Sequence, residues 1–121
     1  MASADFDLLR GTLDLLILKA LQGPPQHGFG VSQWIRQVTL NELRLEDGTL
    51  YTSLHRLEKR RLLQGEWRVT ENNRRARYYR LTPAGKETLS RDSARWTAYA
   101  TAVFRILKTK REAIRILEEA V

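Results

Sequence analysis

The sequence predicts a mainly α-helical fold with one small β-hairpin, and three observations support this prediction. Apolar residues recur every three or four positions in three separate segments of the first 60 residues. Two short runs rich in Trp, Val and Tyr follow, separated by a polar loop. The last third of the chain repeats apolar residues at seven-residue intervals. We therefore expect three helices, a two-stranded hairpin and a long C-terminal helix, in that order.

The first two helices are predicted from their apolar stripes. Residues 8–23 form the first, which a Gly-Pro-Pro sequence ends, and residues 28–38 form the second. Between the second and third helices, Leu43 and Leu45 alternate with charged residues and predict a very short extended piece. The predicted stripes consist of Leu9, Leu13, Leu16, Ile17, Ala20 and Leu21 in the first helix and of Val31, Trp34, Ile35 and Val38 in the second.

The third helix is expected at residues 48–60, with two chemically different faces. Asp47 is the predicted N-cap, because its carboxylate can accept hydrogen bonds from the free amides of the first turn. At about 100° per residue, Leu50, Leu54 and Leu57 fall in one narrow sector of the helix. The opposite side carries Thr52, His55, Arg56 and Lys59. We expect the leucines to pack on the domain and the polar side to remain free.

The hairpin is expected from residues 62–69 and 76–82, with the polar loop 70–75 between them. Strand alternation predicts that Tyr79 is buried and that Tyr78 is partly exposed. Three arginines are expected to cluster at the tip of the hairpin: Arg74, Arg75 and Arg77.

The C-terminal helix begins with a start signal, because Thr82 can cap the helix and Pro83 suits its first position. In a chain this short, the apolar stripe of residues 83–121 is most simply covered by a second copy of the chain. The alternative is that the helix breaks near the sequence KTKRE and folds back. The predicted dimer interface consists of Leu89, Trp96, Ala100, Val103, Leu107, Ile114 and Leu117.

The charge of the chain favours an anionic partner. The formal net charge is +7 over 121 residues, and the sequence pI is about 10.2. Residues 47–82 hold 9 Lys and Arg against 4 Asp and Glu, whereas residues 1–46 hold 4 against 5. Because the positive charge is concentrated in the third helix and the hairpin, we expect those elements to bind nucleic acid.

Several other classes of function are disfavoured by the residues. Without cysteine, the chain has no disulfide framework and no thiolate metal site, and His27 and His55 lack companion ligands at a suitable spacing. We see no nucleophile with a base at a defined spacing. No apolar run approaches the roughly 18 residues of a membrane span. We therefore expect a cytoplasmic protein that is not an enzyme, with no metal, no cofactor and no membrane partner.

Together these elements predict a winged helix-turn-helix DNA-binding domain at residues 1–82, followed by a dimerisation helix at residues 83–121. In this architecture the second helix of the turn motif enters the major groove of DNA. The hairpin, called the wing, lies along the DNA backbone. The recognition helix would be residues 48–60 and the basic part of the wing residues 71–77.

Four ordered blocks of the sequence resemble the PadR family of bacterial transcriptional regulators. They read GTLDLLILKAL, HGFGV, EDGTLYTSLHRLEKRRLL and NNRRARYYRLTPAGKETL, and they span roughly residues 8–89. The wing sequence ENNRRA resembles most a group within the family that is common in Acidobacteria. Two positions depart from the family pattern: Arg61 stands where glycine is common, and Phe29 where tyrosine is common. The first departure makes the end of the recognition helix hard to place.

The resemblance implies a homodimeric repressor that binds a pseudo-palindromic operator in double-stranded DNA. By position, the DNA-facing residues of the recognition helix would be Gly48, Thr49, Tyr51 and Thr52, followed by His55, Arg56 and Lys59. Hydroxyl groups at the helix start suit phosphate oxygens and base edges, and the later cations suit phosphates. The wing would contribute Asn73, Arg74, Arg75 and Arg77.

Three alternatives stay open at this point. The basic wing would also serve a non-specific architectural DNA-binding protein. The long helix would also suit a winged-helix module that docks on another protein. Trp96 has two interpretations, as plain dimer packing or as a wall that binds a small aromatic effector.

Overall fold

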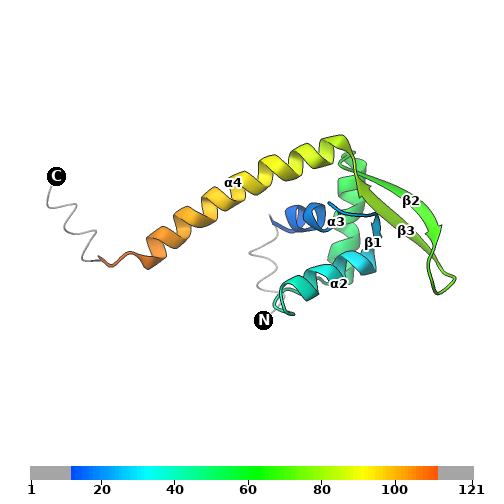
Figure 1. Ribbon diagram of the computed structural model, residues 1–121, viewed down its shortest axis with the longest axis horizontal. Helices are drawn as coiled ribbons and strands as arrows, with labels where there is room; N and C mark the ends of the chain where they lie inside the picture. Colours follow the sequence, from blue (N-terminus) through cyan, green and yellow to red (C-terminus); the bar gives the residue numbers. More distant parts are fainter. Residues whose placement is uncertain (1–11, 112–121) are drawn as a thin grey trace. The chain divides into compact units, whose positions relative to one another are not determined.

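The computed structural model describes residues 12–111, which contain four helical segments and one three-stranded sheet (Figure 1). This arrangement confirms the predicted mainly α-helical, winged helix-turn-helix fold. The elements are helical residues 12–20, β1 (Gln26–His27), α2 (Gly28–Val38), α3 (Asp47–Lys59), β2 (Leu63–Val69), β3 (Arg75–Leu81) and α4 (Pro83–Lys108).

The sheet is antiparallel with strand order β1-β3-β2, so it has one strand more than the predicted hairpin. The extra strand, β1, pairs Gln26 with Tyr79 and His27 with Tyr78. The segment around Leu43 and Leu45, predicted to be a very short extended piece, joins no sheet. Leu45 is nevertheless buried, which explains its apolar character without any sheet pairing.

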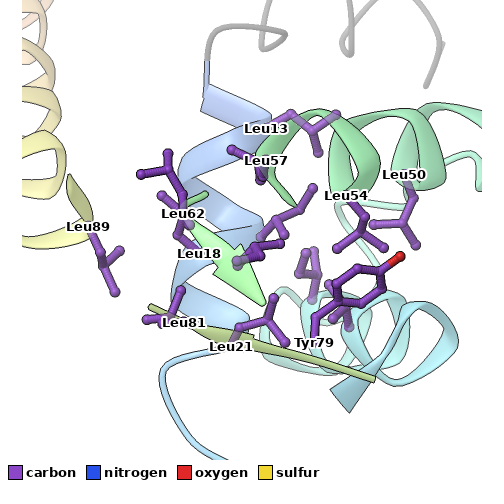
Figure 2. Close-up of a cluster of buried hydrophobic side chains, with 14 of the residues drawn as sticks. Leu13, Leu18, Leu21, Leu50, Leu54, Leu57, Leu62, Tyr79, Leu81 and Leu89 are labelled. Atoms are coloured by element: carbon purple, nitrogen blue, oxygen red, sulfur yellow. The ribbon is translucent and has the colours of Figure 1, made fainter. Parts of the chain in front are cut away.

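The core lies between α3, the sheet and helical residues 12–20 (Figure 2). Leu50, Leu54 and Leu57 of α3 are fully buried, as their spacing predicted, and Tyr79 of β3 is also buried. Burying a leucine side chain contributes about 1.5–3 kcal/mol relative to leaving it exposed. The leucine face of α3 is therefore a main source of the free energy that holds this helix on the domain.

The second helix is less buried than its apolar pattern predicted. Val31 and Ile35 are buried, but Trp34 and Val38 are exposed, so their assignment to a packed stripe was wrong. The core therefore packs against only part of the apolar face of α2, the part that carries Val31 and Ile35. The N-terminus of α2 is capped by His27, whose Nδ1 accepts a hydrogen bond of 2.9 Å from the Gly30 amide.

Both ends of α3 differ in detail from the prediction. The N-cap is Glu46, which makes no side-chain capping bond, and Asp47 is the first helical residue. At the other end, Arg61 has a φ of 64°, a left-handed conformation that usually favours glycine. The Leu62 amide then donates to the Leu57 carbonyl at 3.0 Å, which closes the helix in the manner of a Schellman motif. The backbone thus turns sharply into β2.

Thr82 caps α4 as predicted and ties its start to the end of α3. Its hydroxyl accepts a 3.0 Å hydrogen bond from the Gly85 amide, and its amide donates to the Leu62 carbonyl at 3.1 Å. A side chain at Gly85 would overlap that same carbonyl, so the first turn of α4 approaches the body closely. Leu89 is buried in the core, and its assignment to a dimer interface was therefore wrong.

The long helix ends earlier than residue 121. Thr109 and Lys110 are not helical, so the helix is not continuous to residue 121 and breaks within KTKRE. The fold-back that the alternative expected lies outside the described residues. The predicted interface residues Ile114 and Leu117 lie outside the described residues. The chain divides into two compact units between Ser90 and Arg91, inside α4. Among residues 12–111, no helix has the length and apolar character needed to cross a membrane.

Candidate nucleic-acid interface

The outward face of α3 carries every residue that the sequence assigned to the recognition helix. The buried side chains on the other face are Leu50, Ser53, Leu54 and Leu57. The exposed set consists of Gly48, Thr49, Tyr51, Thr52, His55, Arg56 and Lys59. The helix therefore presents hydroxyl groups near its start and cations near its end, which is the order of chemistry that the sequence predicted.

Gly48 stands in open space at the start of α3. A Cβ atom built there would meet no atom within 4 Å, and the residue has no left-handed φ. Neither packing nor backbone conformation within the described residues requires glycine at this position. Glycine inside a helix costs about 0.5–1 kcal/mol relative to alanine. A close approach by an external partner would account for its presence.

Tyr51 is held partly by packing. A Cβ atom at Gly28 would lie only 2.6 Å from Tyr51 Cε1, so the ring rests on the first residue of α2. The side chain is still 43% exposed. Tyr51 therefore links α3 to α2 while a large part of its surface remains accessible.

Arg56 is also held by the body of the domain. Its Nη2 donates to Asp14 in the first helical segment, and Arg60 Nη1 lies 4.0 Å from the other oxygen of the same carboxylate. The Arg56 side chain remains 44% exposed, because the ion pair occupies only one side of its guanidinium. The pair therefore orients Arg56 and partly neutralises it without burying it.

The tip of the wing is a tight turn that presents two adjacent arginines. Asn73 has a φ of 60°, which asparagine tolerates better than most residues. The Thr70 amide donates to the Arg74 carbonyl at 2.7 Å and closes the loop. Arg74 and Arg75 are both exposed at this turn. The backbone conformation explains Asn73, and the two arginines supply positive charge to the surface.

Arg77 does not lie at the tip, so that part of the prediction was wrong. It is opposite Trp67 in the middle of the hairpin. Its Nε donates to Glu58 Oε1 of α3 at 3.2 Å, and its Nη2 donates to Glu58 Oε2. This hydrogen bonding lowers the pKa of Glu58 and raises the pKa of Arg77. The adjacent Tyr79 is buried, and burial raises the pKa of its hydroxyl.

Trp67 was not assigned to the candidate site, yet it lies at its centre. The side chain is 58% exposed on β2. The Cζ atoms of Arg75 and Arg77 lie 5.0 Å and 5.4 Å from its ring centroid, within the range of cation–π contacts. The observed register places Trp67 opposite Arg77, whereas the predicted six-residue loop would have paired it with Tyr78, so the sequence carried no signal for this contact.

A groove of about 510 Å³ runs between the start of α2, α3 and the wing. Aromatic rings line it from all three elements, and the cationic side chains in its lining come from the wing. Among its lining residues are Phe29, Tyr51, His55, Trp67, Arg74 and Arg75. The recognition helix and the wing therefore form one surface with a depression between them, rather than two separate patches.

A second candidate surface lies on α4 after Ser90. Trp96, Ala100, Val103 and Leu107 fall on one side of the helix at the predicted spacing. Trp96 and Leu107 are 43% and 73% exposed, and Ala100 and Val103 are partly buried. Three further exposed apolar residues, which the seven-residue pattern did not include, flank this stripe: Tyr99, Phe104 and Ile106.

No candidate metal site is present in the described part of the chain. Residues 12–111 contain no group of three His, Asp or Glu side chains that is placed to hold a metal ion.

Comparisons with known proteins point to one family of regulators. The model of the transcriptional regulator PadR-like family matches residues 17–91. The transcriptional regulator Rv3488 of Mycobacterium tuberculosis is 39% identical over 83 residues, which cover 69% of this chain and 74% of that protein. These relatives are transcriptional regulators and not enzymes.

Two solved structures extend the likeness to the fold. A transcriptional regulator from Clostridium thermocellum superposes with a TM-score of 0.76 at 28% identity, covering 84% of this chain and 96% of that one. A PadR family transcriptional regulator from Eggerthella lenta superposes with a TM-score of 0.74 at 30% identity, covering 89% and 92%.

Proposed function

Because the chain belongs to the PadR-like family of transcriptional regulators, we propose that it is a homodimeric repressor that reads a pseudo-palindromic DNA operator in the bacterial cytoplasm. One observation carries this proposal. The recognition helix α3 buries its leucines and exposes a polar, basic face, next to a wing with two exposed arginines. An α-helix with such a face fits the major groove of DNA.

The residues of this surface divide into two roles. Thr49, Tyr51 and Thr52 offer hydroxyl groups, and the Thr52 methyl group can also contact a thymine methyl. Lys59 and Arg74 offer charges that suit phosphates, which set affinity and register but carry no sequence information directly. Specificity would therefore depend on the start of α3, and affinity on its end and on the wing.

Quantitative footprinting with a salt titration tests this division. We expect Thr52→Ala to reduce the preference for the operator over random DNA by a factor of about 5–100, the range for one base contact. We expect Lys59→Gln to weaken binding to both DNAs alike and to reduce the salt slope by about 0.9. Wild-type protein that binds all sequences equally would support an architectural DNA-binding protein instead. Absence of any DNA binding at low salt would support a protein-docking module.

The proposal includes dimerisation through α4. The observation that supports it is the apolar stripe of Trp96, Ala100, Val103 and Leu107, in which Trp96 and Leu107 are exposed. A two-fold dimer that reads half-sites one DNA turn apart needs its two recognition helices roughly 34–36 Å apart. Sedimentation equilibrium should report a dimer, and a monomer at all concentrations would contradict this part of the proposal.

Trp96 is also proposed as a contact for a small aromatic effector, since two exposed indole rings across a dimer would form flat walls for a planar molecule. Titration of planar aromatic compounds against the protein, followed by its tryptophan fluorescence, tests this role. We expect quenching that Trp96→Leu removes. Quenching that persists in the variant would place the binding elsewhere.

A further inference from the structure

An ion pair between Glu58 and Arg77 joins the recognition helix to the wing. The DNA contacts proposed above do not include this pair. Glu58 lies on α3 near the edge of the exposed face, and Arg77 lies on β3 in the middle of the hairpin. Their side chains are only 26% and 28% exposed. The carboxylate receives hydrogen bonds from two nitrogens of the same guanidinium, a fork geometry that fixes orientation as well as distance.

The third member of this arrangement is Gly65 of β2. A Cβ atom there would lie 2.8 Å from Arg77 Nε and 3.1 Å from Glu58 Oε2. Gly65 has no positive φ, so its backbone does not require glycine. The absence of a side chain instead leaves the space in which the two charged groups meet.

The pair continues into the outer part of the wing. Trp67 lies opposite Arg77 in the strand register, and its ring is within cation–π distance of both Arg77 and Arg75. A continuous series of contacts therefore runs from α3 through Arg77 and Trp67 to Arg75, next to the tip. A shift of Arg77 relative to α3 would move the ring and the tip with it.

We propose that Glu58 and Arg77 are positioning residues that set the spacing between the recognition helix and the wing, so that both contact DNA at once. This inference rests on the function proposed above. It assigns Arg77 an indirect role, because Glu58 occupies the Nε–Nη2 edge of its guanidinium. That edge is the one a phosphate would otherwise take in a bidentate contact.

Glu58→Ala distinguishes this positioning role from a simple effect of charge, because the two predict opposite changes in DNA affinity. Removing a negative charge beside DNA and freeing an arginine should strengthen binding if charge alone matters. If the pair positions the wing, operator binding should instead weaken by a factor on the order of ten, within the range of coupling in hydrogen-bonded networks. The matched control is Glu66→Ala on β2, which frees Arg68 from its ion pair without touching α3. The control should bind as tightly as wild type or more tightly.

Two further measurements exclude a merely structural effect. Hydroxyl-radical footprints of Glu58→Ala should lose protection where the wing lies and keep it where α3 lies. The salt slope should also fall by about 0.9 for each phosphate contact that the wing loses. Gly65→Ala adds a methyl group beside Arg77 Nε and Glu58 Oε2 without changing charge, so these side chains must shift, and the variant should reproduce both effects in weaker form. It also serves as the second variant if Glu58→Ala does not fold.

The outcomes distinguish the inference from the proposed function. Glu58→Ala and Gly65→Ala that bind the operator as tightly as wild type, with complete wing footprints, would overturn the positioning role and leave the DNA-binding function intact. Wild-type protein that binds no DNA would overturn the proposed function itself.

Discussion

The part of the chain before Arg91 buries most of its large apolar side chains, whereas the part of α4 after Ser90 exposes them. Among the described residues, the first unit buries fifteen apolar side chains in one cluster. In the second unit Trp96, Tyr99, Phe104, Ile106 and Leu107 are all exposed. The first unit therefore has its own hydrophobic core, whereas the described part of the second unit leaves an apolar surface uncovered.

The apolar surface of α4 has a defined direction. At about 100° per residue, Tyr99, Phe104 and Ile106 lie on either side of the stripe through Trp96 and Leu107. Together they cover about half of the helix circumference, wider than the two-position seam of a coiled coil. The polar side, which includes Thr101, is left for solvent. The contrast with the domain core indicates that folding of the first unit and the proposed assembly depend on separate sets of residues.

The largest expected effect is on the domain core. Leu54→Ala removes a fully buried side chain of α3 and should lower the free energy of unfolding by about 2–5 kcal/mol. Urea denaturation followed by circular dichroism measures this loss. Ile106→Ala, on exposed α4, is the control and should change the unfolding of the first unit by less than about 0.5 kcal/mol. Equal losses of unfolding free energy in the two variants would contradict the difference between a buried core and an exposed α4.

The next effect is on assembly. Leu107→Glu places a charge in the proposed interface and should weaken dimerisation by about 2 kcal/mol or more, roughly thirtyfold. Thr101→Glu puts the same charge on the polar side and should leave the dimer unchanged. Analytical ultracentrifugation over a concentration series compares the two. If both variants dissociate, or if neither does, dimerisation does not depend on the apolar stripe.

A smaller effect is expected where α3 turns into β2. Arg61 has a left-handed backbone conformation, which costs a non-glycine residue about 1–2 kcal/mol. Glycine avoids this cost, but its greater flexibility in the unfolded chain offsets part of the gain in stability. Arg61→Gly should therefore stabilise the first unit by about 1 kcal/mol, measured as a higher urea midpoint at constant slope. A lower midpoint would mean that the arginine side chain contributes more than its backbone costs.

The smallest effect is a dependence on pH. The hydrogen bond from Arg77 holds the pKa of Glu58 below its ordinary value of 4.5. The ionised carboxylate therefore stabilises the folded state fully above about pH 4.5, and this contribution is lost as pH falls through the lowered pKa. The difference in unfolding free energy between wild type and Glu58→Gln should be largest at neutral pH. The difference should shrink in acid. A difference that is constant with pH would show that ionisation of Glu58 does not contribute to stability.

Local patterns were sufficient to predict much of the fold. The leucine spacing of α3 identified Leu50, Leu54 and Leu57 as core residues, and strand alternation identified Tyr79, because both patterns depend on burial of one face. The strand β1 could not be predicted in this way, since two residues show no alternation. The break after Lys108 was also not fixed by the apolar pattern, which continues through Ile114 and Leu117.

The candidate site was predictable to a similar extent. The exposed residues of α3 follow from the position of its leucines, so Thr52 and Lys59 could be named in advance. Leu89 was assigned to the wrong surface, because a seven-residue repeat cannot tell a core contact from a dimer contact. The pair of Glu58 and Arg77 joins residues 19 positions apart through the packing of the hairpin on α3, and no local pattern reports such a contact.

Selection of bound DNA from a random library, carried out with wild-type protein and with Thr52→Ala, tests most directly whether the exposed face of α3 reads sequence. We predict that wild type enriches a motif with two inverted half-sites and that Thr52→Ala relaxes the preference at the same base position in each half. Enrichment of no motif, or an identical motif for the two proteins with equal preference at every position, would contradict this assignment.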